Sequence, residues 1–270
     1  MTSSDNAANT HSTVRRDLNL YNEANGWLIT SASRSGLSTA TPCRGSGSKQ
    51  WRAAIADGGF LPVQVTEDNP INIRVVVNDR LVAREEAEWV DRLSWKLAVP
   101  DGRLVLAAGS EYVCEGEDDA RFVREVEIPA GTYRVDVYSY LHGVNGRLGL
   151  RHAGVEDAAA LREYWEDTRG GDPVPAWLLS ELRDADQDAT ESAEDALSVA
   201  QKRSWRVWEE SVHHATSDDA QELHLVDFLV HLTPLIELPP MPALDDGWFD
   251  CLQAPRRPQR APTRPVLRRS

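Results

Sequence analysis

Residues 121–141, RFVREVEIPAGTYRVDVYSYL, decide the class of fold. Every second position is apolar except Arg124 in Phe122 to Ile128, and Tyr133, Val135 and Val137 alternate after Pro129-Ala130-Gly131. Successive side chains of a β-strand point to opposite faces, so this period of two predicts two strands, each with one buried face. A Pro-x-Gly sequence favours a tight turn. The stretch therefore predicts an antiparallel hairpin.

Shorter segments with strand character lie on both sides of this stretch. Residues 85–95 are charged and contain two tryptophans, which predicts either a short helix or an irregular strand. Pro100-Asp101-Gly102 has the composition of a hairpin turn that leads into another strand. The further predicted strands are residues 28–30, 61–65, 71–77, 103–106 and 223–232.

The pattern becomes helical between residues 156 and 214. Leu161, Tyr164 and Trp165 stand at i, i+3 and i+4, which predicts an amphipathic helix that ends before Gly170-Gly171. Two more helices are predicted after Pro175 and after Ser192. We therefore expect a mainly β protein with α additions, in the α+β class. Its architecture would be an antiparallel β-sandwich or jelly-roll-like domain with helices packed on one side.

Three parts of the chain are expected. Residues 1–25 are polar and predicted to be disordered, and residues 251–270 form a Pro- and Arg-rich tail that is also predicted to be disordered. Residues 26–250 would form one β-sandwich domain with a helical insertion at 156–214. No apolar run approaches the roughly 20 residues of a membrane span. With three distant cysteines and no apparent secretory signal, we expect a cytoplasmic protein.

Charge is segregated along the chain. Six of its 29 bases lie in the last 16 residues, which contain no acid, so the first 254 residues hold 23 bases against 43 acids, a charge of −20. Such a body repels nucleic acid and anionic membranes and attracts basic proteins. Salt adaptation would give the same composition. The tail could contact phosphates or an acidic partner, fold back on the acidic body, or be simply solvated.

A run of six acids precedes and begins one predicted helix. Acids are favoured at a helix N-terminus, so the run could be no more than a solvated helix start. Alternatively, it forms an electrostatic docking surface for a basic protein. The residues of this acidic segment are Asp184, Asp186, Asp188, Glu191, Glu194 and Asp195.

Tyr138 and Tyr140 form a second candidate binding surface. They lie on the strand face opposite Tyr133 and Val135. Exposed aromatic side chains on a sheet can bind a partner. We favour the other interpretation, in which the helices after residue 150 cover this face.

Metal-binding and catalytic patterns are weak. His224, Asp227 and His231 would share one face of a helix, as metal ligands require, but on the favoured strand His224 lies opposite the other two. Neither a Gly-x-Ser-x-Gly elbow nor a cysteine with a local cationic partner is present. We predict no catalytic residue, metal or cofactor, and an enzyme site assembled in three dimensions stays an alternative.

Residues 102–146, GRLVLAAGSEYVCEGEDDARFVREVEIPAGTYRVDVYSYLHGVNG, resemble part of the competence protein J family of bacterial β-sandwich proteins. This segment covers about one-sixth of the chain, and its motif consists of Pro129, Gly131, Tyr133 and Val135. Members of this family inhibit a partner nuclease. The resemblance implies a fold and a class of partner but no functional residue.

The leading hypothesis is a non-enzymatic bacterial protein that neutralises or regulates a basic partner, as inhibitors of nucleases and immunity proteins against toxins do. Its acidic body would not bind nucleic acid directly. The alternatives are a hydrolase or sugar-modifying β-sandwich enzyme, and a structural or assembly subunit.

Overall fold

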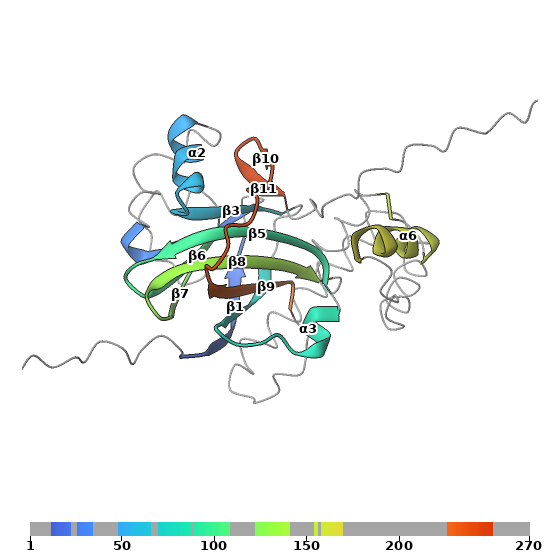
Figure 1. The fold of residues 1–270 in the computed structure, drawn as a ribbon, viewed down its shortest axis with the longest axis horizontal. Coiled ribbons are helices and arrows are strands. Elements are labelled where there is room, and N and C mark those ends of the chain that lie inside the picture. The colour runs from blue at the N-terminus through green and yellow to red at the C-terminus, as the bar shows by residue number, and fades with distance from the viewer. Residues whose placement is uncertain are drawn as a thin grey trace, which may run out of the picture.

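The computed structural model describes most of two β-sheets and the helices beside them (Figure 1). The mainly β class with added helices is confirmed, whereas the jelly-roll-like detail stays a prediction. The described residues are 12–22, 26–34, 48–65, 70–87, 89–108, 122–140, 154–155, 158–169 and 226–250.

One sheet has five strands in the order β1-β4-β9-β8-β5. Neighbouring strands are antiparallel except β4 and β9, which are parallel, so the sheet is mixed and not purely antiparallel as expected. A parallel pair needs a long crossover, and 150 residues separate these two strands. The strands are β1 (Val14–Tyr21), β4 (Pro70–Val77), β9 (Phe228–Pro234), β8 (Gly131–Tyr140) and β5 (Trp89–Val99).

The other sheet has six strands in the order β10-β11-β3-β2-β6-β7. It is also mixed, because β11 runs parallel to β3. The strands are β10 (Leu244–Asp245), β11 (Trp248–Asp250), β3 (Phe60–Gln64), β2 (Gly26–Ser31), β6 (Arg103–Ala108) and β7 (Val123–Glu127).

The two sheets share one hydrophobic core. Alternate residues of β5, such as Trp95 and Leu97, belong to the same buried cluster as Trp27 and Ile29 of β2. Trp27 is fully buried and its ring lies 5.6 Å from that of Phe228 in β9. Burial of apolar side chains from both layers is therefore the main force that holds the sheets together.

The prediction that residues 121–141 form a hairpin is wrong, because the two strands do not pair with each other. The strands form as β7 and β8, but among the described residues β7 pairs with β6 whereas β8 pairs with β5 and β9. Val126 and Val135 nevertheless face the same core, as the alternation predicts. A period of two identifies a strand and its buried face but not its partner, and here the turn carries the chain from one sheet to the other.

A second turn crosses between the sheets beside the first. Pro100-Asp101-Gly102 connects β5 to β6, which lie in different sheets, so it is not a hairpin turn either. The Ile128 N–H donates a hydrogen bond of 2.9 Å to the Gly102 carbonyl. Gly102 has a φ of +70°, and a Cβ there would lie 2.8 Å from the Ile128 carbonyl oxygen. Glycine is therefore required where the two crossings meet.

Strand β1 corrects the expectation that residues 1–25 are disordered. It pairs with β4 from Val14 to Tyr21. Its sequence is largely polar because Arg15 and Asp17 point to the outer face of the sheet, where charged groups of β4 and the following segment bind them. Composition alone could not reveal those partners.

The helices pack in different places. In α2 (Lys49–Ala56), which was not predicted from the sequence, Trp51 and Ile55 enter the core. α3 (Ala83–Ala87) precedes β5, so residues 85–95 contain both a short helix and a strand. α6 (Ala158–Arg169) confirms the helix predicted around Leu161.

The helices predicted after Pro175 and Ser192 lie outside the described residues. No helix in the described part of the chain is long and apolar enough to cross a membrane.

Candidate functional site

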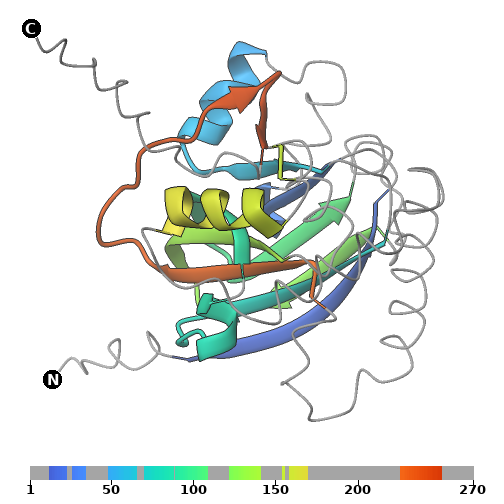
Figure 2. The ribbon, with the colours of Figure 1, turned by 90° about the vertical axis from the view of Figure 1, so that its right-hand side faces the viewer.

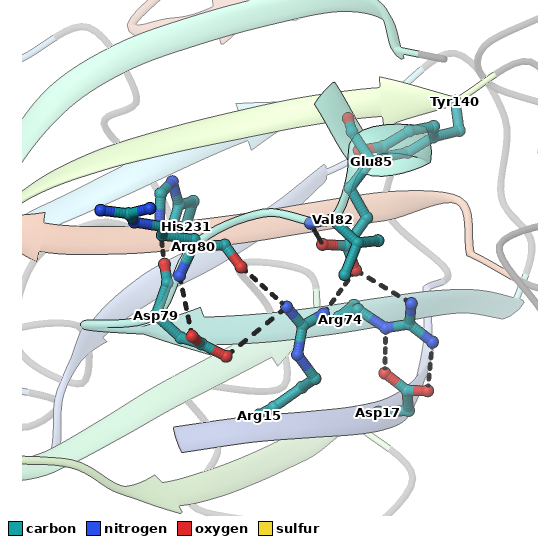
Figure 3. Close-up of polar contacts among 9 residues, drawn as sticks. All are labelled: Arg15, Asp17, Arg74, Asp79, Arg80, Val82, Glu85, Tyr140 and His231. Carbon is teal, nitrogen blue, oxygen red and sulfur yellow. Dashed lines mark hydrogen bonds and ion pairs between the residues drawn. The ribbon is translucent and has the colours of Figure 1, made fainter. Parts of the chain in front are cut away.

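A charged network lies on the outer face of the five-stranded sheet, away from the shared core (Figure 3). Arg74 of β4 and Glu85 of α3 form its centre, with 3.0 Å between Nη1 and Oε1. Their side chains are 3% and 0% exposed. Because Ile73 and Val75 face the core, Arg74 between them must point outward, and α3 covers it.

Strand β1 supplies the remaining partners of this network. Asp17 binds the Arg74 guanidinium through two hydrogen bonds, of 2.7 Å to Nε and 2.8 Å to Nη2. Arg15 donates to Glu85 and lies 3.7 Å from Asp79. Burial by itself would lower the pKa of Arg74, but the hydrogen bonds and charges of Asp17 and Glu85 raise it above its ordinary value.

The network fixes the segment that follows β4. Glu85 accepts a hydrogen bond of 2.9 Å from the Val82 N–H, and its main-chain carbonyl accepts one of 2.7 Å from the Tyr140 hydroxyl. His231 Nε2 lies 2.8 Å from the Asp79 carbonyl oxygen. These contacts join the segment to β8 and β9 (Figure 3). We interpret the network as a clamp that holds α3 on the sheet.

A second charged cluster connects β5 and β8. Asp136, whose side chain is 6% exposed, lies 2.8 Å from Nη2 of Arg92 and 3.1 Å from Nε of Arg134. Burial would raise the pKa of Asp136, but Arg92, Ser94 and Arg134 lower it below its usual range. Arg92 also lies over the Tyr138 ring, 5.3 Å from its centre.

Tyr138 and Tyr140 are both buried, at 6% and 0% exposure. Burial is the main reason why the pKa of Tyr138 rises to about 12. The Trp89 ring lies 5.7 Å from that of Tyr138, and α6 contacts Trp89 through Arg169. Tyr140 is covered by α3, whose Glu85 carbonyl accepts from its hydroxyl, and Tyr138 packs against Trp89. Coverage of this face by the helices after residue 150 stays a prediction. Neither ring has an open surface here, and a role for them in partner binding stays a prediction.

The other predicted residues are only partly described. The acidic segment of six residues lies outside the described residues, as does His224, so the docking surface stays a prediction. No group of three or more potential metal ligands occurs in the part of the chain that the structure describes, which contains Asp227 and His231 but not His224.

Asp227 connects three strands. Its Oδ2 accepts a 2.7 Å hydrogen bond from the Asn72 N–H, and its own N–H donates to the Asn72 carbonyl. Its carbonyl accepts from the Tyr140 N–H at 3.0 Å. Burial raises the pKa of Asp227 to about 7, while the Asn72 N–H acts in the opposite direction. The residue fixes the start of β9 between β4 and β8.

The pair of Arg74 and Glu85 was not predicted from the sequence. One signal was available: Arg74 is the only charged residue within the mostly apolar run at 71–77. A charge inside a strand that is buried on both faces requires a partner of opposite sign. The pattern could not identify Glu85 as that partner.

Residues 235–243, here called the strap, join β9 of one sheet to β10 of the other (Figures 1 and 2). Ile236 is 96% exposed, Leu238 54% and Met241 39%. Residues 232–250 contain four acids and no base. The strap and the β10 turn that follows it therefore present an apolar and acidic surface to solvent, to which the strap contributes one acid, Glu237.

A cavity of about 380 Å³ lies between β1 and β7, the outer strands of the two sheets. Arg15 and Arg16 line it from β1, and Glu125 and Glu127 line it from β7. Its walls thus carry charges of both signs. They fit a polar occupant, but they do not specify which one.

No family model matches the sequence, and no curated protein matches it. Among solved structures, the chain is similar to one described as crocagin biosynthetic gene J, with 16% identity and a TM-score of 0.42 over 83% of this chain and 99% of that one. It is also similar to ComJ from Bacillus subtilis, described as an inhibitor of the DNA-degrading activity of NucA. Identity is 9% and the TM-score 0.33, over 48% of this chain and 86% of ComJ. The weak resemblance to the competence protein J family is confirmed at this low identity and partial coverage.

Proposed function

We propose that this protein is a non-enzymatic binding protein that neutralises or regulates a basic protein partner. The observation that carries the proposal is the charge of −20 on residues 1–254. A surplus of this size produces a negative potential that raises the rate of encounter with basic proteins. It also repels nucleic acid, so a nucleic-acid ligand of the acidic body is disfavoured.

Internal ion pairs leave this surplus of acids unchanged. Several arginines lie within 4 Å of carboxylates of the same chain, and three of these carboxylates, Glu85, Asp136 and Asp101, have side chains no more than 21% exposed. Exposed acids remain elsewhere, including Glu127 on β7 and Glu166 on α6. The arginines concerned are Arg15, Arg74, Arg92, Arg103 and Arg134. Each pair neutralises one base and one acid, so the surplus of acids and the net charge of −20 on residues 1–254 stay the same.

The kind of basic partner follows from the resemblance of residues 102–146 to the competence protein J family. That family implies a nuclease, and a protein toxin has the same basic character when its substrate is a nucleic acid. Inhibition would then require the acidic surface to occupy the region where the partner binds its anionic substrate.

Affinity capture from an extract of the native cells at low salt tests the proposal. We expect a basic protein that salt elutes and whose activity falls when it is bound. Neutralising the six residues of the acidic segment to Asn or Gln should weaken its capture. Failure to recover a basic protein, or equal activity of the free and bound partner, would contradict the proposal.

A further inference from the structure

The strap concentrates the exposed apolar surface of the described residues. Only four large apolar side chains among them are prominently exposed, and three of the four, Ile236, Leu238 and Met241, lie within six residues of the strap. Isolated exposed apolar residues are common, but clustered ones mark sites of interaction. An occupant for this surface is therefore to be expected.

The strap is anchored at both ends. The Leu235 N–H donates a hydrogen bond of 3.1 Å to the Thr132 carbonyl, and Pro239 in the middle is buried. After the strap, β10 pairs with β11, and the Gly247 carbonyl between them accepts a 2.6 Å hydrogen bond from the Trp51 indole. A surface held in this way loses little conformational entropy on binding.

Charge identifies what this surface attracts. Glu237 lies between the two most exposed apolar residues of the strap, and Asp245 and Asp246 follow in β10 and its turn. All three residues are exposed, and no Lys, Arg or His occurs in residues 232–250. The complementary ligand is a segment that combines cations with apolar groups.

The C-terminal tail of this chain has that chemistry. Residues 255–270 contain six arginines and no acid, together with four prolines, Val266 and Leu267. Arginine can pair with exposed carboxylates while proline, valine and leucine contact apolar side chains. Proline also reduces the entropy that an extended segment loses when it docks.

The tail begins close to the strap along the chain. β11 ends at Asp250, and only four residues separate it from Pro255. At about 3.5 Å per extended residue, this connection spans less than about 20 Å and the tail itself up to about 55 Å. A tether this short gives an effective concentration on the order of millimolar, so a weak contact is enough for docking.

We propose that residues 255–270 dock in cis on the strap and cover its apolar and acidic surface. The tail would then act as an internal competitor that a basic partner displaces. This second step rests on the proposed function, whereas the docking itself does not. The separation of a basic tail from an acidic body then has a structural role, because the tail binds the surface that a basic partner would otherwise bind.

A binding assay between the tail and the body tests the docking directly. A fluorescently labelled peptide of residues 255–270 is titrated with the chain truncated after residue 254 and with the full chain, and anisotropy is measured at low salt. We expect the truncated chain to bind the peptide at least about tenfold more tightly than the full chain, whose own tail occupies the site.

Substitutions in the truncated chain locate the site. Ile236→Ser with Leu238→Ser should weaken peptide binding about tenfold, because two apolar contacts are lost. Glu237→Gln should weaken it about two- to threefold, as expected for one exposed ion pair. Val82→Ser and Glu127→Gln are matched controls, since both residues are exposed and neither belongs to the strap. Unfolding midpoints of all variants establish that they are folded.

The results either support or overturn the inference. Loss of binding confined to the strap variants supports it. Four results would each overturn it. The control variants could weaken peptide binding as much as the strap variants do, or binding could weaken only when the acidic segment is neutralised. The peptide could also fail to bind, or it could bind the full and truncated chains equally well. Because the assay contains no partner, its failure leaves the proposed function standing, and a failed affinity capture leaves the docking standing.

Discussion

The guanidinium of Arg74 and the carboxylate of Glu85 form an ion pair in which both side chains are almost completely buried. The pair joins β4 to α3 on the side of the sheet opposite the shared core, and Asp17 completes the coordination of Arg74 from β1. Burial makes each of these charges depend on its partner, since neither can be solvated by water.

Replacing Glu85 by Gln should therefore destabilise the protein by about 3 kcal/mol, because Arg74 would remain buried with less compensation. Asp17→Asn is the matched control. Asp17 binds the same guanidinium but its side chain is 59% exposed, so we expect a smaller loss of about 1 kcal/mol. Urea unfolding measures both. Equal losses for the two variants would show that burial of the pair is not what matters.

Asp227 should make the protein less stable as the pH rises. Its pKa is about 7 in the folded protein, above the value of 3.8 for an unperturbed carboxyl group. Between these values the folded state holds a proton that the unfolded state has released, so the free energy of unfolding falls with pH. Above about pH 7 this contribution is constant.

Asp227→Asn should remove this dependence, since an amide stays neutral and its oxygen can still accept from the Asn72 N–H. We expect the variant and the natural chain to be similarly stable near pH 4 and the variant to be more stable at pH 8, by on the order of 3 kcal/mol. Chemical unfolding at the two pH values measures this. A variant that is less stable at pH 8 would contradict it.

Asp136 should show the opposite dependence. Its pKa is lowered in the folded protein, so its carboxylate contributes stability above the pKa of the unfolded chain and loses that contribution as the pH falls. Asp136→Asn should cost about 2 kcal/mol at pH 7, where two arginines lose their partner. The cost should shrink at pH 3. A cost that is the same at both pH values would mean that its ionisation is not responsible.

Gly102 is expected to tolerate no side chain. Gly102→Ala combines a positive φ with a contact of 2.8 Å to the Ile128 carbonyl oxygen, so we expect a loss of about 3 kcal/mol. Gly154 provides the control, because its φ of +80° is similar but no atom of the described residues lies within 4 Å of the position that a Cβ would take. Gly154→Ala should cost only about 1 kcal/mol. Thermal unfolding of both variants separates the contact from the backbone strain.

Much of the fold could be predicted from local periodicity. The alternation at residues 121–141 predicts both strands and their buried faces, since Val126 and Val135 do enter one core. It could not predict that β7 and β8 belong to different sheets, because the choice between a hairpin and a crossing depends on contacts such as that of Ile128 with Gly102, more than 20 residues away.

The candidate sites were less accessible from the sequence. Arg74 and Glu85 are 11 residues apart, and nothing local indicates that they meet. The surface of the strap depends on which of its apolar residues are left uncovered, whereas its prolines at 239, 240 and 242 indicate only that the segment is irregular. Tyr138 and Tyr140 alternate as expected, but the structure was needed to establish that they are covered.

The salt dependence of partner binding tests the central claim most directly. The dissociation constant of the captured basic protein is measured from about 50 to about 500 mM salt. Binding that depends on the acidic body should weaken by about tenfold or more over this range, because salt screens charges separated by more than a few ångströms. Neutralising the acidic segment should flatten the dependence. An affinity that stays constant across the range would contradict recognition by charge.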